Sequence, residues 1–327
     1  MTIELVVLIV IMGLVFDYTN GFHDAANVVS TVIATRVLAP IVAITMASFF
    51  NMLGATQVSG VAHTITTGLI DAREATQLMV LAALTGAIVW NIVTWYFGIP
   101  SSSSYALVGG LIGAAFVKAG SSIILWHGVL YKVVIPMFLS PIAGFFLGLL
   151  VMRIIIKMPG KVRKYHHMQI GSAAVVALSH GLNDAQKSMG IITLGLLSAG
   201  VIPHPTIPLW VIFSCALVIG LGTAFGGFRI IHTMGFEITK LEPRQGFAAE
   251  VGASVVILIA SALGMPVSST HMIAGSITGV GAAKGSHAVK WITAHKMVLA
   301  WFLTLPGAAL VSAITYKLFL NFFSPII

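Results

Sequence analysis

The feature that most restricts this chain is a series of long apolar stretches with few charges between them. Residues 75–98, 133–152 and 298–321 are examples, and a helix needs about 20 such residues to cross a bilayer. Hydrophobic types make up 58% of the 327 residues and charged types only 8%, against about 25% charged residues in soluble domains. Long unbroken runs also differ from the short alternating strands of an outer-membrane barrel. The sequence therefore predicts an all-α polytopic membrane protein.

The positions of the basic residues predict how the chain is oriented. The net charge of +8 does not indicate a nucleic-acid-binding protein, because the Lys and Arg residues lie in short loops between apolar stretches, as is usual for membrane proteins. With residues 153–168 on the cytoplasmic side, 12 Lys and Arg residues fall inside and four outside. We therefore predict that both termini lie outside and that the 153–168 loop is cytoplasmic.

The second half of the sequence repeats the first. Residues 98–104 (GIPSSSS) correspond to residues 264–270 (GMPVSST), 166 positions later. Residues 21–27 (GFHDAAN) correspond to residues 181–187 (GLNDAQK), 160 positions later. Because both pairs occur in the same order at nearly the same offset, we predict two membrane repeats, 1–152 and 169–327, joined by a basic linker at 153–168. We expect each Ser-rich stretch to lie at the tip of a re-entrant-type hairpin. Each half then crosses the membrane an odd number of times, so the two repeats are predicted to have inverted topology.

The first copy of the acidic motif places a carboxylate deep in an apolar stretch, where a charge is costly. Asp24 and Asn27 are three residues apart and so share one helical face. We expect Asn20 and Gly21 to break the helix and expose backbone carbonyl groups. Carboxylate, amide and carbonyl oxygens suit a small hard cation. The alternative is a polar kink with a purely structural role.

The second copy of the acidic motif contains Asn183, Asp184, Gln186 and Lys187. A lysine in the middle of a span is rarer than an aspartate. It is expected to pair with one of the two motif aspartates or to meet an anionic substrate, and a structural ion pair is the alternative. The histidines at positions 23 and 180 are equally consistent with packing and with proton transfer.

The two hydroxyl clusters, residues 101–104 and 268–270, each follow a Gly-x-Pro sequence. Proline is favoured in a first helical turn, so we expect a helix to begin at each cluster. The free N–H groups of a helix N-terminus bind oxyanions, and hydroxyl groups add further donors. Plain helix capping is the alternative. Glu250, near the start of another span, is expected at the membrane border as a helix N-terminal acid.

With these motifs the chain resembles the inorganic phosphate transporter (PiT) family, whose hallmark is a duplicated Gly-x-Asn-Asp-x-x-Asn-like motif. The resemblance covers nearly the whole chain, although His23 stands where the family usually has Asn. It implies a cation-coupled importer of inorganic phosphate in the cytoplasmic (inner) membrane, driven by sodium or protons. It also implies a homodimer, and the short central loop is similar to that of prokaryotic members.

Together, the residues and the resemblance predict a sodium-coupled phosphate symporter that works by alternating access. The expected sodium ligands are Asp24, Asn27, Asn183 and Asp184. The expected phosphate ligands are Ser102, Ser103, Ser104, Gln186, Lys187, Ser268, Ser269 and Thr270. We expect no cofactor beyond coupling sodium ions, no nucleic-acid partner and no enzymatic activity. The alternatives are a proton-coupled phosphate or sulfate permease on the same scaffold and, less favoured, an ion channel.

Overall fold

The computed structural model describes residues 3–57, 60–158 and 162–323, which form helices joined by short connections. In chain order the α-helices are α1 (Ile3–Ala34), α2 (Pro40–Ala55), α3 (Gly60–Thr67), α4 (Gln77–Tyr96), α5 (Ser103–Ala119), α6 (Trp126–Val129), α7 (Ile135–Lys157), α8 (Val162–Ser198), α9 (Leu209–Phe225), α10 (Phe228–Phe236), α11 (Pro243–Ala262), α12 (Ser269–Ala282) and α13 (Trp291–Phe323). Among the described residues, five helical segments are long and apolar enough to cross a membrane, or up to seven if each bent pair is one span. This confirms the predicted all-helical, multi-span architecture.

The order of helices in the first half recurs in the second. Helices α2 and α3 form a pair bent by 69°, and α9 and α10 form a pair bent by 71°. The hairpin of α4 and α5 recurs as α11 and α12. The short helices α3 and α10 were not predicted, because a bend at a short break is set by packing and leaves no periodic pattern in the sequence.

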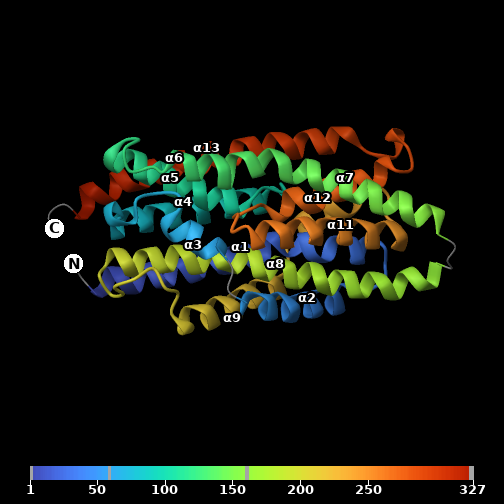
Figure 1. Ribbon diagram of the computed structural model, residues 1–327, viewed down its shortest axis with the longest axis horizontal. Coiled ribbons are helices and arrows are strands. Elements are labelled where there is room, and N and C mark those ends of the chain that lie inside the picture. Colours follow the sequence, from blue (N-terminus) through green and yellow to red (C-terminus); the bar gives the residue numbers. More distant parts are fainter. Residues whose placement is uncertain (1–2, 58–59, 159–161, 324–327) are drawn as a thin grey trace.

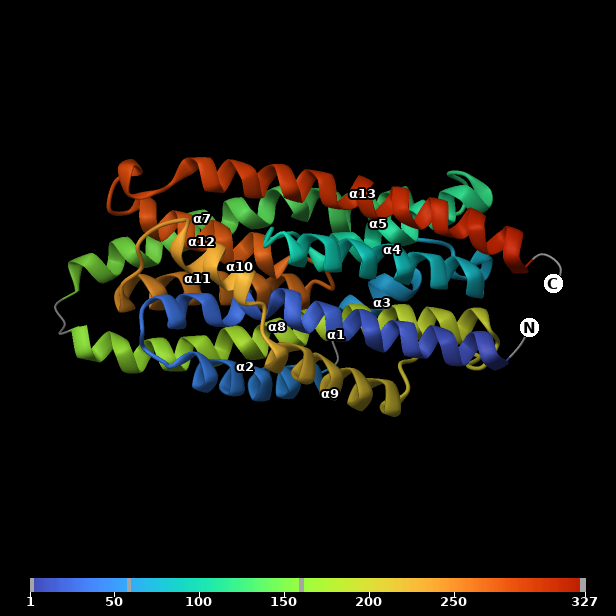
Figure 2. The same ribbon diagram turned by 180° about the vertical axis from the view of Figure 1, so that it is seen from behind.

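Helices α1 and α8 lie side by side and run in opposite directions (Figures 1 and 2). The start of α1 and the end of α13 lie at one end of the molecule, and the end of α7 and the start of α8 lie at the other (Figure 1). Ser188 of α8 donates a hydrogen bond to Asp17 of α1 at 2.5 Å. Because the two helices are antiparallel, their acidic motifs meet near the middle of the bundle.

The predicted break at Asn20 and Gly21 is wrong, because α1 is one continuous helix through both residues. Gly21 instead allows close contact with α9: a Cβ atom there would lie 2.6 Å from the backbone oxygen of Ile219. Gly181 plays the same part in α8, where a Cβ atom would collide with the backbone of Asn51 in α2. The glycines in these motifs therefore bring helices together and do not interrupt them.

The stretch that was predicted as a basic linker is largely helical. Helix α7 continues to Lys157 and α8 begins at Val162, while residues 159–161 lie outside the described residues. Lys and Arg are good helix formers. A cluster of basic residues therefore does not show where a helix ends.

Candidate substrate and cation site

Two helical hairpins bring the hydroxyl clusters to the centre of the molecule. Helix α5 begins at Ser103 and α12 at Ser269, and the two N-terminal ends meet. The Ser104 hydroxyl donates a hydrogen bond to the backbone oxygen of Val267 at 2.9 Å. We call residues 101–104 and 267–270 the hairpin tips. The expectation that a helix begins at each cluster is confirmed.

The first residue of each predicted phosphate-binding set is a helix cap. The Ser102 hydroxyl accepts a hydrogen bond from the N–H of Tyr105 at 3.2 Å, and the Ser268 hydroxyl accepts one from the N–H of His271 at 3.3 Å. Capping of this kind typically stabilises a helix by about 1 kcal/mol. Ser102 and Ser268 are therefore helix caps, which is the alternative to phosphate binding that the sequence left open.

Asp24 lies among hydroxyl, amide and imidazole groups and is buried, with 2% of its surface exposed. Its Oδ2 lies 2.7 Å from the Ser103 hydroxyl, and its Oδ1 lies 2.8 Å from His23 Nδ1 and 3.4 Å from the Thr270 hydroxyl. The Ser103 hydroxyl also lies 2.6 Å from the Asn20 amide oxygen. Ser103 and Thr270 belong to the two different hairpin tips, so this carboxylate contacts both repeats.

Asp184 is completely buried and has a different set of neighbours. Its Oδ1 forms an ion pair with the Lys187 ammonium, one helical turn away. Its Oδ2 lies 2.8 Å from His180 Nε2 and accepts a hydrogen bond from the Ser269 hydroxyl at 3.0 Å. Lys187 therefore pairs with the aspartate of its own motif and not with Asp24.

The two acidic motifs lie next to each other at the centre of the bundle. Ligand atoms of Asp24, His180 and Asp184 all lie within 4.8 Å of one another, in a group that could hold a metal ion. Asn27 reaches the opposite hairpin tip, where its amide nitrogen donates to the Thr270 hydroxyl at 2.9 Å and to the Ser269 hydroxyl at 3.2 Å. We refer to Asp24, Asn27, Asp184, Lys187 and the four tip residues Ser103, Ser104, Ser269 and Thr270 as the central cluster.

Two of the predicted ligands make their described contacts outside the central cluster. The Asn183 amide nitrogen donates to the Ser261 hydroxyl at 2.7 Å and to the Met265 carbonyl at 3.3 Å, which braces the α11–α12 hairpin. The Gln186 amide nitrogen donates to the Gln57 carbonyl at 2.8 Å, next to the α2–α3 break. Neighbours in a helical motif point in different directions, so a short motif does not place all of its side chains in one site.

His23, which departs from the family motif, braces the other hairpin. Its Nε2 lies 3.0 Å from the Thr94 hydroxyl and 3.3 Å from the Ser101 hydroxyl. His23 thus contacts the α4–α5 hairpin as Asn183 contacts the α11–α12 hairpin, one in each repeat. Thr94 belongs to this network but was missed, because a single threonine in an apolar helix carries no distinctive sequence signal.

The prediction that Glu250 is a helix N-terminal acid is wrong. Glu250 lies two turns into α11 and is completely buried. It accepts hydrogen bonds from Thr31 at 2.6 Å, from Gln169 at 3.1 Å and from Ser172. A buried carboxylate needs such partners, and they come from α1 and α8, which a sequence pattern in α11 cannot reveal.

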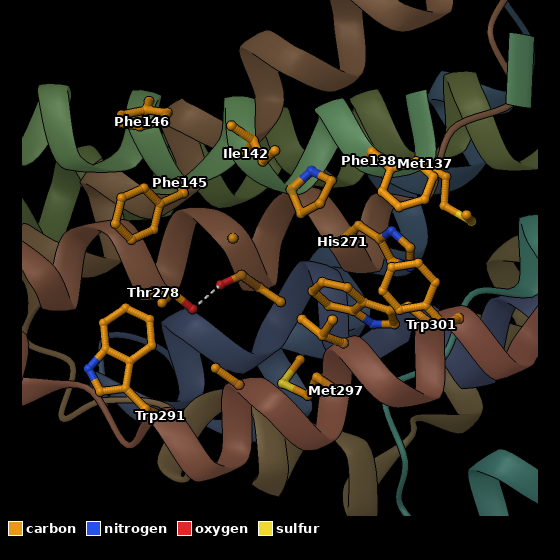
Figure 3. A pocket seen from close by; sticks show the side chains of 16 residues that line it. Met137, Phe138, Ile142, Phe145, Phe146, His271, Thr278, Trp291, Met297 and Trp301 are labelled. Atoms are coloured by element: carbon orange, nitrogen blue, oxygen red, sulfur yellow. Dashed lines mark hydrogen bonds between the residues drawn. The ribbon is translucent and has the colours of Figure 1, made fainter. Parts of the chain in front are cut away.

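A cavity of about 370 Å³ lies beside the hairpin tip, between α7, α12 and α13. Figure 3 shows His271 and Trp301 toward one end and Trp291 toward the other. The His271 ring stacks on Trp301, with 4.1 Å between the ring centroids, and Trp301 Nε1 donates to the Pro100 carbonyl at 2.9 Å. The lining is mainly apolar and aromatic. Such a surface suits hydrocarbon, so we assign the cavity no part in anion binding.

Comparison with known proteins identifies the family. A sequence profile of the Phosphate transporter family matches residues 20–165 and, a second time, residues 158–312. The chain belongs to this family. Two successive matches to one profile are what an internal duplication produces, and their junction falls within the predicted basic linker.

Two curated relatives extend over almost the whole chain. The "Probable low-affinity inorganic phosphate transporter" of Rhizobium meliloti (strain 1021) is 48% identical, covering 95% of this chain and 96% of that protein. The protein of the same description from Bacillus subtilis (strain 168) is 42% identical over 95% of this chain and 96% of the relative. Both relatives are described as transporters of inorganic phosphate.

A solved structure shares the fold. The protein described as "The sodium-dependent phosphate transporter" superposes with a TM-score of 0.89, covering 97% of this chain and 99% of that one at 24% identity. At this level of identity the likeness concerns the fold. The family match, the curated relatives and the apolar helices together identify a multi-pass membrane transporter.

Proposed function

We propose that the protein is a sodium-coupled symporter that imports inorganic phosphate across the cytoplasmic membrane. The observation that carries the proposal is the central cluster itself. Three tip hydroxyls from two helix N-termini, those of Ser103, Ser269 and Thr270, contact two buried aspartates, Asp24 and Asp184. Hydroxyl groups and helix N-termini favour an oxyanion, and the carboxylates favour a cation. Phosphate as the anion is supported by the relatives, and sodium by the description of the solved neighbour.

Coupling follows from competition for hydrogen-bond donors. The Ser103 and Ser269 hydroxyls now lie against the two carboxylates at 2.7 and 3.0 Å. A bound phosphate would take these donors, which would leave carboxylate oxygens free for sodium. Without the cation, phosphate would face like charges, and two unit charges about 4 Å apart repel by about 4 kcal/mol at an effective dielectric constant of about 20. Phosphate therefore binds well only when the cation is present, which suppresses leak of phosphate alone.

Alternating access in this proposal rests on two inverted repeats. Its support is the antiparallel course of α1 and α8 and the meeting of the hairpin tips at the centre of the bundle (Figure 2). Movement of one hairpin relative to the other would open the central cluster to one side of the membrane at a time. We further propose that the termini lie outside, that the 153–168 region is cytoplasmic, and that two copies form a homodimer. Light scattering on the purified protein tests the dimer.

Proton coupling is the second candidate. It is favoured by one observation, the 2.8 Å separation of each motif aspartate from a histidine, His23 or His180. Histidine is the side chain that most readily changes charge near neutral pH. A sulfate permease on the same scaffold is distinguished by competition, because sulfate cannot donate a hydrogen bond to a buried carboxylate at neutral pH whereas phosphate can.

The test is uptake of labelled phosphate into proteoliposomes, with sodium and proton gradients imposed separately. We expect an inward sodium gradient to drive uptake at constant pH. Asp24→Asn and Asp184→Asn should abolish it while the proteins still insert, and Asp71→Asn, in a connection outside the spans, serves as the matched control. Uptake that ignores sodium and follows pH would overturn sodium coupling. Wild-type uptake by both aspartate variants would overturn the site.

A further inference from the structure

Asn27 and Lys187 occupy equivalent places in the two repeats. Each lies three residues after its motif aspartate, and each reaches the hairpin tip of the other repeat. Asn27 donates to the Thr270 hydroxyl at 2.9 Å, and the Lys187 ammonium donates to the Ser104 hydroxyl. Thr270 and Ser104 are themselves equivalent at the offset of 166. The equivalent position therefore holds an amide side chain, Asn27, in the first repeat and a basic side chain, Lys187, in the second.

The surroundings of the Lys187 ammonium are those of a bound cation. Its Nζ contacts the Asp184 carboxylate and the Ser104 hydroxyl, and it donates to the Val267 carbonyl at 2.9 Å. The side chain is completely buried. A carboxylate, a hydroxyl and a backbone carbonyl form an oxygen set of the kind that holds hard cations such as sodium. An ammonium group that already contacts all three leaves no place among them for a free ion.

The neighbours of Asp24 differ in charge. Its described contacts are the Ser103 and Thr270 hydroxyls and His23. Among these described contacts there is no lysine or arginine that forms an ion pair with Asp24, as Lys187 does with Asp184. The formal charges of the two aspartates and the one lysine of the central cluster sum to a single negative charge, which one monovalent cation would neutralise.

We propose that Lys187 is a tethered substitute for a coupling cation and that the central cluster takes one mobile cation, at Asp24. This inference rests on the proposed function, because it states how many cations that symporter binds beside phosphate. It revises the symmetric pair of sodium sites expected from the sequence. Lys187 then sets cation stoichiometry and does not act as a ligand of phosphate.

The test replaces Lys187 with asparagine, which is the residue at the equivalent position 27 of the first repeat. Lys187→Asn removes the ammonium and supplies an amide oxygen, as Asn27 does in the first repeat. Lys187→Arg keeps the positive charge and is the matched control. Thermal unfolding of the purified protein is followed in sodium chloride and in choline chloride at equal ionic strength without phosphate, because an ion that binds only the folded state raises the unfolding temperature.

We expect Lys187→Asn to be less stable than wild type in choline and to gain a sodium-dependent rise in unfolding temperature at least twice that of wild type. Lys187→Arg should show no such gain. Because the Hill coefficient can rise up to the number of binding sites, the coefficient for sodium activation of phosphate uptake in proteoliposomes should move from about 1 in wild type toward about 2 in Lys187→Asn. Equal sodium effects in wild type and Lys187→Asn, with only the phosphate KM raised, would overturn the inference and make Lys187 an anion ligand.

Asp24→Asn provides an independent check should Lys187→Asn fail to fold. If the mobile cation binds at Asp24, this variant loses the sodium-dependent stabilisation measured in wild type. Retention of the full effect would overturn the inference. The binding measurement uses no phosphate, so failure of the proposed function, seen as absent phosphate uptake by wild type, is distinguishable from failure of the tethered-cation inference.

Discussion

The buried ion pair of Asp184 and Lys187 makes a quantitative prediction about stability. Both side chains are completely buried, so removing one partner leaves an uncompensated charge in a medium of low dielectric constant. Losses of this kind are about 3–5 kcal/mol. We therefore expect Asp184→Asn and Lys187→Met each to lower the free energy of unfolding by about 3–5 kcal/mol. The double variant, which buries no charge at the pair, should lose much less than the sum of the two single losses.

The assay is equilibrium unfolding in mild detergent, followed by tryptophan fluorescence in sodium-free buffer. The exposed pair of Lys284 and Glu242 is the matched control. Its atoms are 3.1 Å apart, but the two side chains are 36% and 59% exposed, and exposed pairs contribute about 0–1 kcal/mol. Lys284→Met should therefore have little effect. If the losses from Asp184→Asn and Lys187→Met simply add in the double variant, the two groups do not interact and the reasoning fails.

Three further predictions concern a helix cap, a close contact between two helices and a buried hydrogen-bond network. Ser102→Ala removes a helix cap and should cost about 1 kcal/mol of stability with an unchanged phosphate KM, whereas Ser103→Ala should raise that KM; the same KM in both variants would contradict the division. Gly181→Val should prevent stable insertion, because its side chain would collide with the backbone of Asn51; a normally folded variant on size-exclusion chromatography would refute this packing. Glu250→Leu leaves three buried donors without an acceptor and should be at least about 2 kcal/mol less stable than Glu250→Gln, and equal thermal stability would contradict the hydrogen-bond network.

The spans and the starts of the hairpin helices could be predicted from local sequence. An apolar stretch of sufficient length has few alternatives in a bilayer, and a Gly-x-Pro sequence followed by hydroxyl residues indicates where a new helix begins. The break at Gly21 was predicted wrongly because a glycine in a helix has two uses, interruption and close approach. The choice between them depends on the facing helix, here α9, whose backbone lies against Gly21.

The candidate site could be predicted as a set of motifs but not as a set of contacts. Asn183 and Gln186 belong to the second motif, yet they brace the α11–α12 hairpin and the α2–α3 break. Conversely, Ser102 looks like its neighbours in sequence but caps a helix. In a helix, each step along the chain turns the side chain by about 100°, so adjacent motif residues serve different surroundings.

By itself, the sequence determined that the chain lies in a membrane, that it is duplicated, and that two buried carboxylates accompany two hydroxyl clusters. These properties depend on composition, segment length and repeated motifs, which can be read from the sequence without knowing which residues contact one another. Only the tertiary structure decided which polar groups meet. Asn27 contacts Thr270 across 243 positions of sequence, and Lys187 contacts Ser104 across 83. Such pairings arise because antiparallel helices and opposed hairpins bring distant residues into one buried volume, where each polar group must find a partner.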